Sequence, residues 1–442
     1  MGTVNFLDEH YSRSQAASIA MSPDAAVDTV VSVLVATQPE AASRAAGGDT
    51  VAREELRRII SEIIASQRIA VRGISRDILI NQIFASIYGY GILQDLVGDP
   101  LVTDIFVNGP DDIWMLRNFK MERVFRSFRD EEDLLRFMHR VLSACGKKIN
   151  EMTPCIDARD TQRRLRINCV IRPINTRGHS IVIRKHPLEH LTPCDLVNSE
   201  MFTEEMADFF NKLVMSRSNI IISGPTGSGK TTFMRALTTY VPGTERIITI
   251  EDTEELFLVH PNCVAQETRK KQGESDIAVT MAQLVTNALR MRPDRIILGE
   301  LRDAETVNLL GAFGTGHAGG FATVHANSSE HAINRLVFLM LHSEITLKRP
   351  ELLEFIAEAV DVIIHVEKRR VINVSEVNGF DHRKGSVLLN TVYSFNKASE
   401  GAGFLTGTFS SAGAVSQRLE QKFRTAGLEH KGGYGAGCRA VL

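Results

Sequence analysis

The first part of the chain carries apolar residues at the spacing of an α-helix. They recur at i, i+3, i+4, i+7 and i+8, which places them on one helical face, and they are Leu56, Ile59, Ile60, Ile63 and Ile64. The pattern predicts an amphipathic helix that begins near Val51. We also predict a second helical stretch over 78–87. Residues 1–50 end in an Ala-, Gly- and Ser-rich stretch, so we expect a flexible N-terminal segment there and a helical region over 51–98.

From Val102 the pattern changes to the alternation that is typical of strands. Apolar and polar residues alternate in TDIFVNG and again in DIWML, and the Asn108-Gly109-Pro110 sequence between them favours a turn. We therefore predict paired strands here, within a smaller α+β N-terminal domain over 99–188.

The second half of the chain alternates short apolar runs with helical stretches. Pro187 and Pro193 disfavour helix in the residue before each of them, which predicts an interdomain linker over 189–200. After it come the strand-like runs NIIIS, RIITIE, RIILGE and FATVH. This order predicts an α/β domain over 201–396 with a parallel-rich sheet covered by helices. Beyond it, 397–442 is glycine-rich and is expected to be a loosely ordered C-terminal tail.

Composition narrows the class of protein. The 442 residues have a formal net charge of -2, with 43% hydrophobic and 24% charged residues, which excludes a wholly disordered or fibrous chain. The near balance of charge also argues against a surface built throughout for nucleic acid, although 151–190 has eight Lys and Arg against four acids. The six cysteines are scattered, which favours reduced cytosolic thiols. No apolar run reaches the ~18 residues of a membrane span, so we expect any membrane contact to be made through partners.

A glycine-rich phosphate-binding motif follows the first strand of the second half. The glycines let backbone N–H groups close around phosphates, Lys230 neutralises the β and γ charges, and the Thr231 hydroxyl can hold Mg²⁺. A tight glycine turn with no ligand would not explain the lysine. The predicted nucleotide-binding residues are Gly224, Pro225, Thr226, Gly227, Ser228, Gly229, Lys230, Thr231 and Thr232.

Carboxylates follow two further strands of the same domain. Glu300 comes at the end of RIILGE, where parallel α/β sheets bind their ligands, and is the candidate activator of the attacking water. Glu251 and Asp252 end the run RIITIE, and we assign them to the nucleotide side because clustered acids need cations. Glu254 and Glu255 are expected to be solvated. The alternative for Glu300 is a solvated acid at a strand end.

Two histidines are further candidates for the nucleotide site, and the absence of one motif bears on the choice of nucleotide. His317 precedes the run FATVH and His325 ends it. One of them is expected beside the γ-phosphate, where a neutral imidazole can sense phosphate charge. Metal ligation by the two histidines is the less favoured interpretation. The guanine-selecting N-K-x-D segment has no counterpart in the core pattern, because Asn396-Lys397 continues with Ala-Ser. ATP is therefore the expected nucleotide.

The order of GPTGSGKT, ITIEDTEEL, RMRPDRIILGELR and GTGHAGGFATVHAN resembles the Walker A, Asp box, Walker B and His box of the type II/type IV secretion ATPase superfamily. The stretches GYGILQDLVGDPLVTDIFVNGPDDI and MTPCIDAR are similar to the N-terminal domain of its CpaF-like branch, the ATPases of tight-adherence pili. The resemblance covers roughly 51–396. It implies a RecA-like P-loop ATPase domain that uses ATP and Mg²⁺.

Site roles are also implied by this resemblance. Glu300 would be the catalytic carboxylate, Glu251 and Asp252 the Asp-box acids, with Asp252 near Mg²⁺, and His325 the His-box residue. Two arginines of the N-terminal domain would reach the γ-phosphate, and by their place in RLRIN and IVIRKH they are Arg166, with Arg164 as the alternative, and Arg184.

The resemblance further implies a cytoplasmic homo-hexamer that docks on an inner-membrane platform protein and powers pilus assembly or protein secretion. A conjugative or effector-translocating ATPase of the same superfamily would share every motif. Alternatives of another class are a nucleic-acid-binding protein and a non-catalytic ATP-binding assembly factor. We expect no specific nucleic acid, because the basic stretch over 151–190 lacks interleaved aromatic residues.

Overall fold

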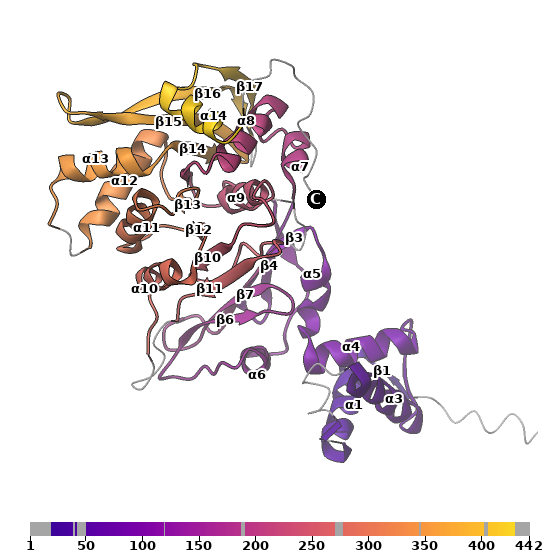
Figure 1. Cartoon of the computed structure of the whole chain (residues 1–442). Coiled ribbons are helices and arrows are strands. Elements are labelled where there is room, and N and C mark those ends of the chain that lie inside the picture. The colour runs from indigo at the N-terminus through magenta and orange to yellow at the C-terminus, as the bar shows by residue number, and fades with distance from the viewer. Residues whose placement is uncertain are drawn as a thin grey trace, which may run out of the picture. The chain divides into compact units, whose positions relative to one another are not determined.

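A computed structural model describes the chain over 19–38, 40–41, 50–118, 120–186, 191–269, 277–343, 346–401 and 405–428. It divides into two compact units, Met1–Leu188 and Glu189–Leu442 (Figure 1). No helix of the described residues combines the length and the apolar character that a membrane crossing requires.

The first unit begins with helices. They are α1 (Pro23–Thr37), α3 (Thr50–Ser66) and α4 (Arg76–Tyr88), beside the short parallel strands β1 (Ile19–Met21) and β2 (Ile69–Val71). The predicted apolar face of α3 is confirmed, because Leu56, Ile60 and Ile64 are buried. The predicted flexible segment over 1–50 is wrong for α1. That helix buries Val30 and Leu34 in the same cluster, and the side chain of its N-cap serine, Ser22, accepts an N–H of the first turn.

A six-stranded antiparallel sheet follows in the same unit, in the order β5-β4-β3-β8-β7-β6. One helix, α6 (Glu131–Ala144), packs its apolar residues with those of the sheet in a single buried cluster. The predicted strand pair around the turn at Asn108 is confirmed as β3 and β4. The strands and the short helices before them are β3 (Val102–Gly109), β4 (Asp112–Arg117), β5 (Lys120–Val124), β6 (Cys155–Asp160), β7 (Leu165–Val170), β8 (Ser180–Lys185), η1 (Gly91–Leu93) and α5 (Gln94–Gly98).

The second unit contains a nine-stranded sheet in the order β11-β10-β12-β13-β9-β14-β15-β16-β17. The strands from β11 to β14 run parallel, and β15 to β17 extend the sheet in antiparallel hairpins. This parallel-rich sheet confirms the predicted α/β, RecA-like class. The strands are β9 (Ile220–Ser223), β10 (Ile247–Glu251), β11 (Cys263–Glu267), β12 (Arg295–Leu298), β13 (Phe321–Val324), β14 (Val362–Glu367), β15 (Arg370–Asp381), β16 (Ser386–Glu400) and β17 (Leu405–Ser411).

Helices cover both faces of this sheet (Figure 1). Along β9, Ile220 and Ile222 pack on the side of α8 and α9, whereas Ile221 packs on the side of α10 to α13. Such a strand is apolar on both faces, which is why its sequence is a continuous apolar run. The helices are α7 (Pro193–Asn198), α8 (Glu204–Met215), α9 (Lys230–Thr238), α10 (Met281–Ala288), η2 (Leu289–Met291), α11 (Glu305–Gly314), α12 (Ser329–Leu341), α13 (Arg349–Ala359) and α14 (Gln417–Thr425).

Two predictions about the ends of this unit are corrected. The expected linker over 189–200 contains helix α7, which Thr192 and Asp195 close with a capping box. The expected loose tail over 397–442 instead continues as the end of β16, then β17 and α14. Because the side chains of 396–400 are exposed, that part of β16 has no apolar alternation to reveal it. Residues 429–442 lie outside the described part of the chain.

Four cysteines, Cys145, Cys155, Cys169 and Cys263, are free thiols, as predicted. Cys194 is disulfide-bonded, so the prediction of reduced thiols is wrong at that residue. Spacing along the chain does not reveal which thiols the fold brings together.

Candidate functional site

The predicted site residues of the second unit lie along one edge of its sheet. Strands β10, β12, β13 and β9 are consecutive parallel neighbours. Glu251 is the last residue of β10, Glu300 follows β12, and His325 follows β13. The phosphate loop follows β9 directly, so all four features share the carboxyl edge, where open α/β sheets bind ligands.

The phosphate loop is tightly packed against the next strand. Gly224 has φ +155°, and a Cβ at this position would come within 2.0 Å of the backbone oxygen of Val366 in β14. Gly229 has φ +99° and forms the N-cap of α9, the helix that Lys230 begins. The Ser228 hydroxyl is buried and has no hydrogen-bond partner among the residues that the structure describes. The loop thus directs a helix N-terminus and an unsatisfied hydroxyl at the place where phosphates would bind.

Lys230 is folded onto its own loop. Its Nζ donates to the backbone oxygens of Gly224 and Pro225, each at 2.8 Å. Burial lowers the pKa of Lys230 to about 8, and the negative charge of Glu300 opposes this shift. A phosphate group would offer the ammonium a stronger acceptor than two carbonyl oxygens, because its oxygens are charged. The lysine is therefore placed to transfer its hydrogen bonds to a bound anion.

Glu300 is held between a cation and a histidine. Arg302 donates to its Oε2 from Nε at 2.8 Å and from Nη2 at 2.5 Å, and its Nη1 donates to Oδ2 of Asp252 at 2.7 Å. This arginine therefore joins the acids that follow β12 and β10. Sequence reasoning missed Arg302, although it lies two residues after Glu300 in the quoted RIILGELR segment.

His325 contacts the other oxygen of the same carboxylate. Its Nε2 lies 2.9 Å from Oε1 of Glu300. Burial and the positive charge of Lys230 lower the pKa of His325, while Glu300 raises it, so the imidazole is neutral near pH 7. His317 precedes β13 and His325 follows it, so the two histidines lie at opposite ends of that strand. Of the two candidates, His325 is the one at the site.

Glu251 occupies a different environment from Glu300. It is 4% exposed, and its carboxylate accepts the backbone N–H groups of Glu255 at 3.1 Å and Leu256 at 3.3 Å. Burial raises its pKa to about 8 despite these two hydrogen bonds. Gly299 makes room for it, because a Cβ there would lie 2.8 Å from Cγ of Glu251. Its carboxylate organises the turn after β10, and its catalytic role remains a prediction.

A pocket of about 410 Å³ opens beside the phosphate loop. Its lining combines the loop's Pro225 with histidine, asparagine and arginine side chains, namely His325, Asn327, His331, Asn334 and Arg335. The pocket therefore adjoins both the phosphate loop and His325.

The residues present also fit Mg²⁺, which prefers oxygen ligands and keeps several waters. Thr231 offers a hydroxyl, and Asp252 and Glu300 offer carboxylates at the same edge. No group of three or more metal-ligating side chains occurs among the described residues. A magnesium ion here would therefore need oxygens from phosphate or water as well.

The predicted arginines lie in the first unit. Arg166 of β7 and Arg184 of β8 are direct cross-strand partners, and Asp104 of β3 is the partner of Arg184 on its other side. The Nε of Arg184 donates to Oδ1 of Asp104 at 2.8 Å. Arg164, the alternative, precedes β7 and has φ +52°. The structure brings Arg166 and Arg184 together, and their contact with a nucleotide remains a prediction.

Comparison with known proteins places these features in a family. The model of the family described as "Type II/IV secretion system protein" matches residues 88–387. A putative conjugal transfer protein of Mycobacterium tuberculosis is 34% identical over 287 residues, which cover 64% of this chain and 81% of the relative. The type IV secretion system protein VirB11 of Brucella abortus is 31% identical over 301 residues, 62% of this chain and 83% of the relative.

Two solved structures also match the chain, at lower similarity. The VirB11 ATPase of Brucella suis, crystallised with sulphate, is 29% identical over 62% of this chain and 89% of its own, with a TM-score of 0.33. The pilus retraction motor PilT with bound ADP is 21% identical over 68% and 80%, with a TM-score of 0.47. Because the family model covers most of both units and includes every site motif, this chain belongs to the type II/IV secretion system protein family.

Proposed function

We propose that this protein hydrolyses ATP and uses the energy to power pilus assembly or protein secretion at the inner membrane. The observation that carries the proposal is the meeting of Lys230, Glu300 and His325 at the carboxyl edge of one parallel sheet. Membership of the secretion ATPase family supports the same activity. ATP is the expected nucleotide, because the chain has no guanine-selecting segment in its core pattern.

In this mechanism the loop over 224–231 binds the phosphates, and Lys230 moves its hydrogen bonds from the loop carbonyls to the β and γ oxygens. Thr231 and Asp252 would hold Mg²⁺, directly or through water. When bound, that ion neutralises charge that develops on the phosphates. Glu300 orients the attacking water and accepts its proton.

The neighbours of Glu300 then set its orientation. Arg302 holds one carboxylate oxygen and His325 the other, so the carboxylate is fixed from two sides. A neutral His325 with its proton on Nε2 donates a hydrogen bond without adding a full charge next to the phosphate. The two contacts thereby hold the Glu300 carboxylate in one orientation, as the proposed base requires.

Assembly and partners belong to the same proposal. We infer a homo-hexamer in which Arg166 and Arg184 of the first unit complete a nucleotide site, since their paired positions suit bidentate contact with phosphate oxygens. The protein would work in the cytoplasm, peripheral to the inner membrane, docked on a platform protein. A conjugative or effector-secreting role is the second candidate, and the names of the M. tuberculosis and Brucella relatives favour it.

The activity is tested with two variants that should differ in phenotype. Lys230→Ala should lose most nucleotide affinity, whereas Glu300→Gln should still bind ATP while its turnover falls by about 10² to 10⁴. Asp303→Asn is the matched control, because it removes an exposed carboxylate three residues from Glu300. Binding is measured with a fluorescent ATP analogue and turnover by phosphate release. Equal loss of binding in both variants would contradict the role of Glu300.

The genes that neighbour the gene of this protein would distinguish pilus assembly from conjugation. Prepilin and prepilin-peptidase genes would support pilus assembly, and relaxase genes would support conjugation.

A further inference from the structure

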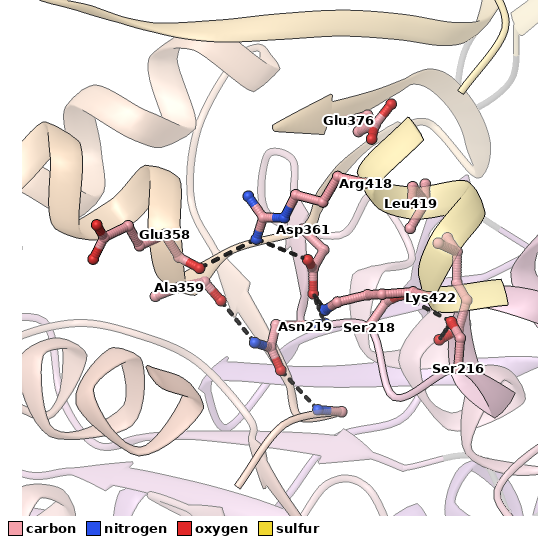
Figure 2. A network of polar contacts seen from close by, with 12 residues as sticks. Ser216, Ser218, Asn219, Glu358, Ala359, Asp361, Glu376, Arg418, Leu419 and Lys422 are labelled. Atoms are coloured by element: carbon pink, nitrogen blue, oxygen red, sulfur yellow. Dashed lines mark hydrogen bonds and ion pairs between the residues drawn. The ribbon is translucent and has the colours of Figure 1, made fainter. Parts of the chain in front are cut away.

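A buried carboxylate lies at the opposite edge of the sheet from the site. Asp361 directly precedes β14, and its side chain is 3% exposed. Its Oδ2 accepts the backbone N–H of Asn219 at 2.8 Å and Nζ of Lys422 at 2.6 Å, and its Oδ1 accepts Nη2 of Arg418 at 3.1 Å. Figure 2 shows both cations reaching the carboxylate from helix α14.

Helix α14 supplies the counterions of Asp361. A buried ion is costly unless it is paired and hydrogen-bonded. Within the described part of the chain, the ion-pair partners of this carboxylate both come from that helix. Arg418 and Lys422 are four residues apart and therefore lie on one face of the helix. Arg418 also donates to the backbone oxygens of Ala357 and Glu358 in the last turn of α13, each at 3.3 Å. Helix α14 thus provides the counterions of a buried carboxylate and also hydrogen-bonds to the backbone oxygens at the end of α13.

Asn219 links the Asp361 carboxylate to the amino ends of three strands. It directly precedes β9, and its Nδ2 donates to the backbone oxygen of Ala359 at 2.7 Å. Its Oδ1 accepts the backbone N–H of Gly319, just before β13, at 2.7 Å. Its backbone N–H binds Asp361, so one asparagine joins the amino ends of β9, β13 and β14 (Figure 2). The oxygen of Gly319 in turn accepts Nη1 of the fully buried Arg295, the first residue of β12.

The same strands carry the candidate site at their other ends. β9 leads to the phosphate loop, β12 to Glu300 and β13 to His325. Each of these strands has four residues, so about 13 Å separates the network from the site. A shift of one strand along its neighbour at the amino edge would change the separation of Lys230, Glu300 and His325.

Helix α14 is docked by more than its charges. Leu419 and Phe423 belong to the apolar cluster that also holds Ile220 and Ile222 of β9. Before the helix, the backbone N–H of Ser416 donates to Oε2 of Glu376 in β15 at 2.8 Å. Removing the two cations would therefore leave the helix in place but leave a buried carboxylate without its counterions.

We propose that Asp361, with Arg418 and Lys422, is a positioning unit for the ATPase site: it fixes the register of β9, β13 and β14 at the amino edge and so the geometry of the groups at the carboxyl edge. This inference rests on the proposed ATPase function. It predicts a loss of turnover with little loss of nucleotide affinity, because the phosphate loop itself stays intact.

The experiment compares Arg418→Gln, Lys422→Gln and the double variant with a matched control on the same helix. Arg424→Gln removes an equal charge, but Arg424 is 65% exposed and contacts Glu420 at 3.5 Å, away from Asp361. The measurements, made on the full chain, are kcat and KM for ATP hydrolysis and amide hydrogen exchange of β9 and β13.

In the double variant we expect kcat to fall at least tenfold, KM to change less than about threefold, and exchange of β9 and β13 to speed up. Each single variant should show a smaller effect of the same kind. A variant that combines Arg418→Lys with Lys422→Arg should have the kcat of the wild type, since it keeps both positive charges. Arg424→Gln should match the wild type.

The proposal would be overturned if the Arg418 and Lys422 variants kept the kcat and the hydrogen exchange of the wild type. It would also be overturned if Arg424→Gln lost as much activity as the double variant. If the double variant does not fold, the single variants decide by the same criteria. Exchange is read without ATP, so a wild-type chain that hydrolyses no ATP would refute the proposed function while the exchange comparison still tests the positioning unit.

Discussion

His365 should make the stability of the second unit depend on pH. It lies in β14, is 4% exposed, and its Nδ1 is 3.0 Å from Oγ of Ser223. Burial lowers its pKa to about 4; the charge of Glu330 opposes this shift and that of Lys230 adds to it. The imidazole is therefore neutral in the folded protein at pH values where the unfolded chain already binds a proton.

The direction and size of the effect follow from that difference. Because the unfolded state takes up the proton first, the free energy of unfolding falls as pH drops below about 6.5 and levels off below the folded pKa of about 4. Between about pH 7 and pH 5 the loss amounts to about 2 kcal/mol at most.

The assay is urea unfolding at about pH 7 and pH 5, followed by far-UV circular dichroism, for the wild type and His365→Gln. Glutamine keeps a polar group beside Ser223 and does not titrate. Fluorescence of the chain's one tryptophan, Trp114 in β4, reports the first unit and serves as the internal control. The wild type should lose about 2 kcal/mol more than the variant. The same pH dependence in both proteins would show that His365 does not carry the effect.

Three further predictions concern the site and its assembly. Arg184→Lys should keep the ion pair with Asp104 and the binding of ADP but reduce turnover by up to about 10³ to 10⁵. Arg177 is exposed, and Arg177→Lys should leave turnover unchanged. Full phosphate release by both variants would show that Arg184 has no part in the mechanism. Specific activity should rise with protein concentration if the site is completed by a second subunit, and constant turnover per chain on dilution would contradict this. Gly299→Ala should lower the free energy of unfolding by about 1 to 3 kcal/mol in a urea titration, because its Cβ would meet Glu251, and an unchanged midpoint would argue against that contact.

The core of the site could be predicted from the sequence because its signals are local. The phosphate loop is a contiguous motif, and Glu300 and His325 follow short apolar runs of the length expected for buried strands. Once those strands are parallel neighbours, their carboxyl ends must share an edge. The sequence therefore predicted that the phosphate loop, Glu300 and one of the two histidines meet at that edge, and the roles of these residues in catalysis stay predictions.

Other features depend on contacts between residues far apart in the chain, and no local pattern announces them. Asn219 and Asp361 are 142 positions apart, and Ser223 and His365 are separated by the same interval. Arg302 was missed because only side-chain geometry shows that it bridges two acids. Helix α14 was missed for a different reason, since its mostly polar sequence follows exposed strands and lies between glycines.

The order of strands in the sheet has a consequence for synthesis of the protein. Both neighbours of β9, namely β13 and β14, come later in the chain, and the nearer of them starts about 100 residues after Ile220. At roughly 5 to 20 residues per second the ribosome needs about 5 to 20 s to make that stretch. During this time a strand with three consecutive isoleucines has both edges unpaired, which exposes it to aggregation. We expect nascent chains that end before Phe321 to bind chaperones more strongly than chains that extend past His365.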